Sequence, residues 1–266
     1  SPSDGPMMHA GRLTLFIELT RREVWTKYRA TSFGLLWAVL GPLLTLWIFS
    51  FFFQALLATR WSQPVYSSVP FALVLFAGIV PHALVAECMS RAGGLVVENP
   101  NYIKKVVFPV ELFFLAVAAA VSVQLLIGLG LLVAGTLVFG PSLSWTIVWM
   151  PVVMLPALLL ALALRFFFGA VTPYLRDVGA LIPFISTALL FFSPAFIPLA
   201  VIPTEYQPYI MANPLTVTIE SLRTILFLGI SPDLRTIAIS CGWTAMALAV
   251  AIVFFRRAKS GFADVV

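Results

Sequence analysis

Hydrophobic positions along this chain fall into six long runs separated by short polar stretches. A helix needs roughly 20 mostly apolar residues to cross about 30 Å of hydrocarbon, and six segments meet that length. The predicted spans are 33–57, 69–90, 110–139, 143–164, 179–200 and 235–255. The third and fourth are separated only by Gly140, Pro141 and Ser142, which predicts a tight hairpin. The pattern therefore predicts an all-α polytopic membrane protein.

The segment before the first span, residues 12–30, has a different pattern. Plotted at 100° per residue, five of its apolar side chains share one face, namely Leu13, Phe16, Ile17, Val24 and Tyr28. Glu18, Arg22 and Arg29 lie opposite, while Leu15 and Leu19 fall off the apolar stripe. This predicts a helix lying in the membrane interface. Residues 1–10 are expected to be a tag remnant or disordered start, which leaves 11–266 as a single transmembrane domain.

Composition supports the membrane class. The chain is 61% hydrophobic and 10% charged, with a mean hydropathy of +1.03, whereas a typical soluble domain is about 25% charged. Little sequence remains for a soluble domain of ordinary size, roughly 100 residues.

Lysine and arginine positions predict the orientation, because cytoplasmic loops retain positive charge. With six spans and a cytoplasmic N-terminus, thirteen of the 16 basic residues lie on the cytoplasmic side. These are Arg12, Arg21, Arg22, Lys27, Arg29, Arg91, Lys104, Lys105, Arg165, Arg176, Arg256, Arg257 and Lys259. The net charge of +5 is then a topological signal rather than a sign of nucleic-acid binding, and both termini are expected in the cytoplasm.

A polar insert, 99–111, lies between the second and third predicted spans. Pro100 and Pro109 bracket it and leave room for about two helical turns. A short cytosolic helix that contacts a partner is expected, and an ordinary connecting loop is the alternative. No GxxxxGK[ST] phosphate loop occurs in the sequence, so the chain is not expected to bind ATP by that route.

Polar residues inside the predicted spans are few. His82 follows Pro81, and a neutral, hydrogen-bonded histidine is favoured over a proton-handling site. Glu87 and Arg91 are spaced to pair on one helix, as are Glu220 and Arg223. No metal-ligand spacing occurs among the His, Cys, Asp and Glu residues.

Aromatic residues accompany the prolines of the fifth predicted span, where freed backbone carbonyls need partners. Sugar rings stack well on aromatic faces, so aromatic side chains here and in the first span are candidates for lining a polymer channel. They are Trp37, Phe52, Phe53, Phe184, Phe191, Phe192 and Phe196. Lipid-facing or core packing is the alternative for each.

Three blocks in one order carry a family resemblance. The first comprises 21–23 (RRE), 27–29 (KYR) and 31–42 (TSFGLLWAVLGP). The second is 99–111 (NPNYIKKVVFPVE). The third comprises 176–178 (RDV), 191–194 (FFSP), 213–214 (NP) and 219–223 (IESLR). Together they resemble the polysaccharide-exporter branch of the type 2 ABC transporter permeases, which includes O-antigen and teichoic acid exporters.

The resemblance implies a bacterial cytoplasmic-membrane permease that is a transport subunit rather than an enzyme. It would form a homodimer with two ABC ATPase subunits, which bind ATP and Mg, and export a polyprenyl-pyrophosphate-linked glycan. The insert would be a coupling helix that contacts the ATPase through Asn101, Tyr102, Lys104, Lys105, Val106 and Phe108.

Two further sites follow from the same resemblance. The lipid phosphate would meet Arg21, Arg22, Lys27 and Arg29, for which membrane anchoring by positive charge is the alternative role. An outer re-entrant gate, or else a simple extracytoplasmic cap, would contain Glu205, Asn213, Glu220 and Arg223.

Two other functions remain open from the sequence. One is an ABC exporter of drugs or small lipids. The other is a membrane-embedded glycosyltransferase or polymerase, which would need acidic residues clustered on one face. Asp177 and the scattered glutamates do not form such a cluster.

Overall fold

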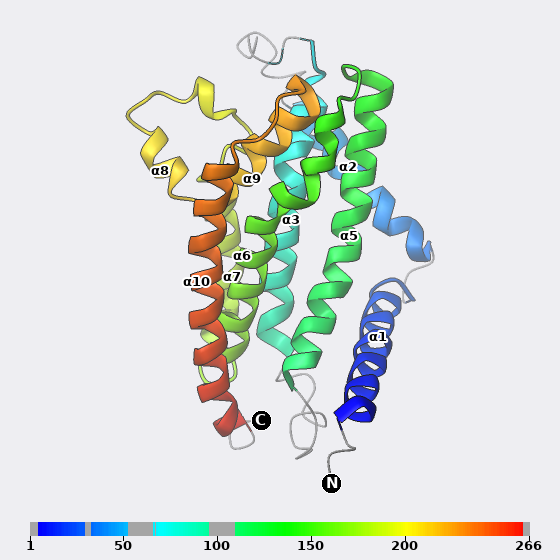
Figure 1. The fold of residues 1–266 in the computed structure, drawn as a ribbon, viewed down its shortest axis with the longest axis vertical. Helices are drawn as coiled ribbons and strands as arrows, with labels where there is room; N and C mark the ends of the chain where they lie inside the picture. The colour runs from blue at the N-terminus through cyan, green and yellow to red at the C-terminus, as the bar shows by residue number, and fades with distance from the viewer. Residues whose placement is uncertain (1–4, 30–32, 53–65, 67, 96–109, 263–266) are drawn as a thin grey trace.

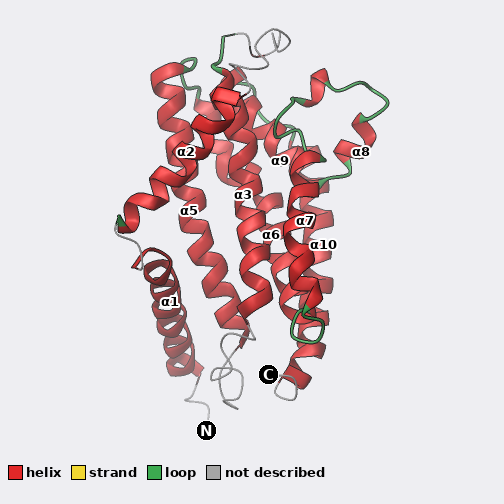
Figure 2. Ribbon diagram, turned by 180° about the vertical axis from the view of Figure 1, so that it is seen from behind, coloured by secondary structure: helices red, strands yellow, loops and turns green. Residues whose placement is uncertain are grey.

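The computed structural model describes residues 5–29, 33–52, 66, 68–95 and 110–262. Within these ranges all regular secondary structure is helical. The helices stand side by side in an elongated bundle, with α1 and α2 along one flank (Figures 1 and 2). α1 begins and α10 ends at the same end of the bundle, called the terminal end below, and the opposite end is called the far end.

Nine α-helices are assigned in the described residues. They are α1 (Gly5–Arg29), α2 (Trp37–Phe51), α3 (Phe71–Leu95), α5 (Val110–Phe139), α6 (Met150–Val171), α7 (Asp177–Phe191), α8 (Gln207–Met211), α9 (Pro214–Arg223) and α10 (Leu234–Ala258). A 3-10 turn, Trp145–Trp149, leads into α6, and a π-helical turn, Thr224–Leu228, follows α9.

Four helical segments are long and apolar enough to cross a membrane: Phe71–Leu95, Val110–Phe139, Trp145–Val171 and Leu234–Gly261. Two shorter apolar helices, Trp37–Ile48 and Asp177–Phe191, lie where the first and fifth spans are predicted. The continuous fifth span 179–200 is wrong, because α7 ends at Phe191 and the chain then turns. Pro194 and Pro198 lack the N–H groups that would extend the helix. The fourth span also runs further than predicted, to Val171.

Glycine, which has no side chain, lets neighbouring helices of the bundle approach closely. α6 packs against both α3 and α10, and a Cβ added at Gly169 of α6 would lie 2.0 Å from the Phe114 ring of α5. Phe114 in turn stacks on Phe166 at 5.7 Å and meets the edge of Phe255 at 4.7 Å. This aromatic cluster joins α5, α6 and α10 near the terminal end.

α1 packs against α5. Leu19, which lies off the predicted apolar stripe, is 6% exposed within a hydrophobic cluster, and Leu15 and Phe16 pack against that cluster. Leu13 and Ile17, which lie on the stripe, are 62% and 55% exposed. α1 therefore carries apolar side chains on two faces: Leu19 contacts the bundle, while Leu13 and Ile17 of the predicted stripe are exposed, and the interfacial position stays a prediction.

Candidate functional site

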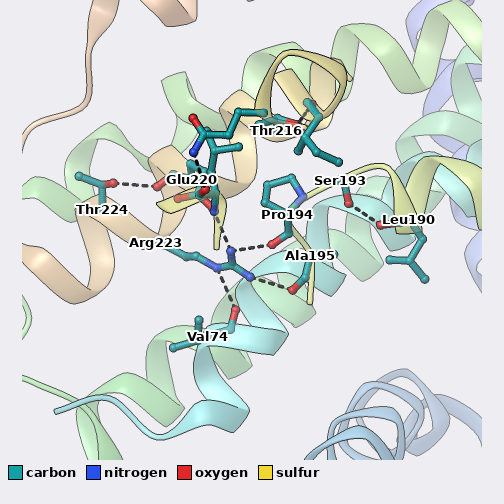
Figure 3. A network of polar contacts seen from close by, with 12 residues as sticks. Val74, Leu190, Ser193, Pro194, Ala195, Thr216, Glu220, Arg223 and Thr224 are labelled. Carbon is teal, nitrogen blue, oxygen red and sulfur yellow. Dashed lines mark hydrogen bonds and ion pairs between the residues drawn. The ribbon is translucent and has the colours of Figure 1, made fainter. Parts of the chain in front are cut away.

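A polar network at the far end is centred on Arg223 of α9 (Figure 3). The Arg223 side chain is fully buried. Its Nε donates to the Val74 carbonyl of α3 at 3.0 Å, and its two terminal nitrogens donate to the Pro194 and Ala195 carbonyls at 2.6 and 2.7 Å. Nη1 also pairs with Glu220 at 3.0 Å, which confirms the pairing predicted from their spacing. Arg223 thus ties α9 to α3 and to the turn after α7.

Asn213 attaches the same turn to the start of α9. Its Oδ1 accepts from the Leu215 N–H at 3.0 Å and caps the helix. Its Nδ2 donates to the Leu189 and Phe192 carbonyls at 2.9 and 3.1 Å. The carbonyls at a helix C-terminus have no partner within the helix, and α7 obtains one from Asn213. The Ser-Pro and Asn-Pro motifs, separated in sequence, therefore form one structural unit.

Glu220 connects further groups to this network. Besides pairing with Arg223, its Oε1 accepts from the Leu199 N–H at 3.1 Å. Burial, with the Glu220 charge adding to it and Arg223 opposing, raises the pKa of Tyr66 to about 12. Burial lowers the pKa of Arg223, while Glu220 and Tyr66 oppose that change. Glu205, the remaining residue predicted for this region, is exposed in the turn before α8.

Gly78 of α3 sets how closely the turn after α7 approaches. A Cβ added there would lie 2.5 Å from the Ala195 carbonyl oxygen and 2.6 Å from its Cα. We expect Gly78→Ala to displace Ala195 from Arg223 and to lower the free energy of unfolding by about 2 kcal/mol, as overpacking typically does. Thermal unfolding of the purified chain in detergent measures this.

Gly242→Ala is the matched control, because a Cβ at Gly242 of α10 would meet no atom within 4 Å. It should leave stability unchanged or raise it slightly, since alanine favours a helix. Equal melting temperatures for the two variants would contradict the close approach at Gly78.

A second set of polar contacts lies toward the terminal end and joins α1 to the bundle. Lys27 forms an ion pair with Glu87 of α3 and a hydrogen bond with Gln124 of α5. Arg91 of α3 pairs with Glu23 of α1 at 2.9 Å. The predicted Glu87–Arg91 pairing is therefore wrong, because each residue pairs instead with a residue of α1.

The residues predicted to meet a lipid phosphate divide between two environments. Arg21, Arg22 and Arg29 are exposed. Lys27 is half-buried and already contacts a carboxylate within the chain. Three of the four cations are thus accessible on α1, whereas Lys27 also holds α1 against α3 and α5.

Arg165 of α6, which the charge distribution predicts on the cytoplasmic side, lies inside the bundle rather than in a polar loop. Its side chain is fully buried in the bundle. Its Nε donates to the Phe114 carbonyl of α5 at 2.8 Å and its Nη1 to the Cys88 carbonyl of α3 at 3.3 Å. Its Nη2 has no hydrogen-bond partner in the described part of the chain. Arg165 therefore joins the terminal end of α3 to the start of α5.

Five of the seven predicted channel aromatics are exposed on the surface of the single chain. Phe184, Phe191 and Phe192 are 73%, 66% and 59% exposed. Trp37 and Phe52 are 39% and 49% exposed. Phe196 is half-buried, with its ring centroid 5.4 Å from that of Phe191. Phe53 lies outside the described residues.

The predicted coupling residues, Asn101, Tyr102, Lys104, Lys105, Val106 and Phe108, also lie outside the described residues. His82 is hydrogen-bonded as predicted, with Nε2 2.9 Å from the Ser186 carbonyl of α7. Among the described residues no group of three or more His, Cys, Asp or Glu side chains is placed to hold a metal ion.

The sequence of this chain is similar to known proteins over most of its length. The family model described as ABC-2 type transporter matches residues 14–227. An O-antigen export system permease protein, RfbA, of Myxococcus xanthus is 23% identical over 253 residues, covering 94% of each chain. The Klebsiella pneumoniae protein of the same name is 25% identical over 255 residues, again 94% of each. The polysialic acid transport protein KpsM of Escherichia coli is 22% identical over 249 residues, which cover 88% of this chain and 90% of KpsM.

The family match includes α2, α3, α5, α6, α7, α8 and α9, so it takes in the Arg223 network and most of the helices that could cross a membrane. The relatives align over nearly their full lengths as well. This chain belongs to the ABC-2 type transporter family, as a multi-pass membrane transport subunit.

Proposed function

We propose that this chain is the permease of an ATP-driven exporter that moves a polyprenyl-linked polysaccharide across the bacterial cytoplasmic membrane. The observation that carries the proposal is full-length similarity to permeases named for O-antigen export and polysialic acid transport. ATP hydrolysis belongs to a separate ATPase subunit, which is supported by relatives named as the permease proteins of export systems.

The distribution of charges supports one orientation of the chain in the membrane. The exposed cations of the α6–α7 turn and of the end of α10, Arg176, Arg256 and Arg257, lie at the terminal end, and α1 with its exposed arginines occupies the half of the bundle nearer that end. This supports a cytoplasmic terminal end, since retained loops are rich in Lys and Arg. α3 ends and α5 begins at that same end, so an ATPase that docks on the chain between these two helices would approach from the cytoplasm.

The export path lies between two copies of the chain. The outward-facing aromatics of α2 and α7 support this, because in one chain they enclose no channel. A second copy related by two-fold symmetry, the commonest arrangement of homo-oligomers, would bring such surfaces toward each other. The far-end helices α8 and α9 would then flank the exit, with the Arg223 network fixing α9 while the more exposed α8 moves.

Charge reversal in the insert tests the ATPase partnership. Lys104→Glu combined with Lys105→Glu should place two anions where two cations meet the ATPase, and so uncouple ATP hydrolysis from export. Tagged chain is purified together with its ATPase and reconstituted in liposomes, and ATP hydrolysis and glycan export are measured in parallel.

Arg256→Glu with Arg257→Glu is the matched control, because both arginines are exposed at the same end of the bundle. That variant should retain coupled transport. Unchanged coupling after reversal of Lys104 and Lys105, or failure of any ATPase to co-purify with the unmodified chain, would contradict the proposal.

A further inference from the structure

A groove with a volume of about 290 Å³ lies between α2, α3 and α5. Along α3 its wall consists of side chains spaced three or four residues apart, including Phe76, Ile79, Ala83 and Glu87. That spacing places them on one face of the helix. Phe76 and Glu87 are about three turns apart, or roughly 16 Å at 1.5 Å per residue. The groove is therefore long and narrow, and it runs along the bundle.

The charged and amide side chains that line the groove lie at one end of it. Glu87 and Gln124 lie toward the terminal end, where Lys27 contacts both. Toward the far end the wall is apolar, from Ala83 to Phe76. On the α2 side the groove is open, because a Cβ added at Gly41 would meet no atom within 4 Å. An apolar trough with a polar mouth matches a hydrocarbon chain that ends in a polar group.

The dimensions distinguish between lipids. A volume of about 290 Å³ along roughly 16 Å of helix fits one hydrocarbon chain lying along the groove better than two side by side. The polar mouth adjoins α1, whose exposed Arg21, Arg22 and Arg29 can attract a phosphate. The matching ligand is a single-chain lipid phosphate.

We propose that this groove holds the polyprenyl anchor of the exported glycan, with its phosphate at the Lys27 mouth and its chain directed toward Phe76. The inference rests on the proposed function for the identity of the lipid. In this proposal the lipid anchor binds between α2, α3 and α5 of one chain, and the sugar part passes between the two copies.

The test uses the purified full chain in detergent and a farnesyl phosphate analogue that carries a diazirine at the end of its hydrocarbon chain. Photolabelling followed by mass spectrometry should mark the stretch of α3 around Phe76 and Ile79 rather than Glu87. Ala83→Phe adds a large side chain from the exposed wall of the groove. It should weaken labelling about tenfold, because the excluded chain atoms lose their apolar contacts.

Ala134→Phe is the matched control, since Ala134 is an exposed alanine of α5 that does not line the groove. Its labelling should equal that of the unmodified chain. Thr45→Phe approaches the groove from α2 and provides a second blocking variant if Ala83→Phe misfolds. The Thr45 hydroxyl donates to the Gly41 carbonyl of its own helix at 3.0 Å.

Labelling that both blocking variants leave unchanged, or that is scattered over the outer surface, would overturn the proposal. So would equal competition by phosphatidylglycerol and by unlabelled farnesyl phosphate, because the site would then take ordinary phospholipid. The assay needs no ATPase. Specific labelling in a chain whose reconstituted complex exports nothing would refute the proposed function and leave the groove as a single-chain lipid site.

Discussion

Replacing Arg223 by methionine should lower the free energy of unfolding by about 4 kcal/mol, the range found when one partner of a buried ion pair is removed. Methionine fills similar space but donates nothing. The Pro194 and Ala195 carbonyls, which lie in a turn, and the Glu220 carboxylate would all lose a donor. For a chain of this size the melting temperature should fall by roughly 10 °C.

The comparison variants separate charge from geometry. Arg223→Lys keeps the charge but not the planar fork of donors, so its melting temperature should lie between those of the methionine variant and the unmodified chain. Arg235→Met removes an exposed arginine at the same end of the bundle and should change little. Similar losses from Arg223→Met and Arg235→Met, measured by thermal unfolding in detergent, would show that the network contributes no stability.

Helices that face lipid on one side could be predicted from hydropathy alone. The bounds predicted for 110–139 match α5, because Pro109 and the Gly140–Pro141 pair mark both ends in the sequence. The predicted end of the fourth span at Leu164 is wrong, because that prediction stops a span at the first charge. Arg165 continues the helix because carbonyls of two neighbouring helices accept its donors. Those acceptors belong to backbone far away in sequence, which hydropathy does not record.

Pairing of charges could be predicted only where both partners share a helix turn and no third group competes. Glu220 and Arg223 meet that condition and do pair. Glu87 and Arg91 have similar spacing but pair with Lys27 and Glu23, because α1 packs against the bundle at that level. The packing of α1 in turn depends on Leu19, which its helical wheel placed off the apolar stripe. Local periodicity therefore predicts that a helix exists but not which neighbour each of its faces contacts.

Substitution of Asn213 should have the second large effect on stability. Its side chain is only 7% exposed, and its amide acts as both donor and acceptor. Asn213→Asp retains the shape and the acceptor for the Leu215 N–H but loses both donors to Leu189 and Phe192. It directs a carboxylate oxygen at two carbonyl oxygens. We expect Asn213→Asp to lower the free energy of unfolding by about 4 kcal/mol, since an unpaired buried charge costs several kcal/mol. Asn213→Ala, which introduces no charge, should lose less, about 2 kcal/mol.

Gln207→Glu is the matched control for the lost donors. Gln207 also donates to two backbone carbonyls, those of Ile202 at 2.9 Å and Leu199 at 3.4 Å. Its neighbours Tyr206 and Pro208 are exposed, so water can replace both hydrogen bonds. Gln207→Glu should therefore lower the free energy of unfolding by less than about 1 kcal/mol. The three variants are compared by reversible unfolding in mixed micelles. If Asn213→Asp proved as stable as Gln207→Glu, Asn213 would not be what holds the end of α7 against α9.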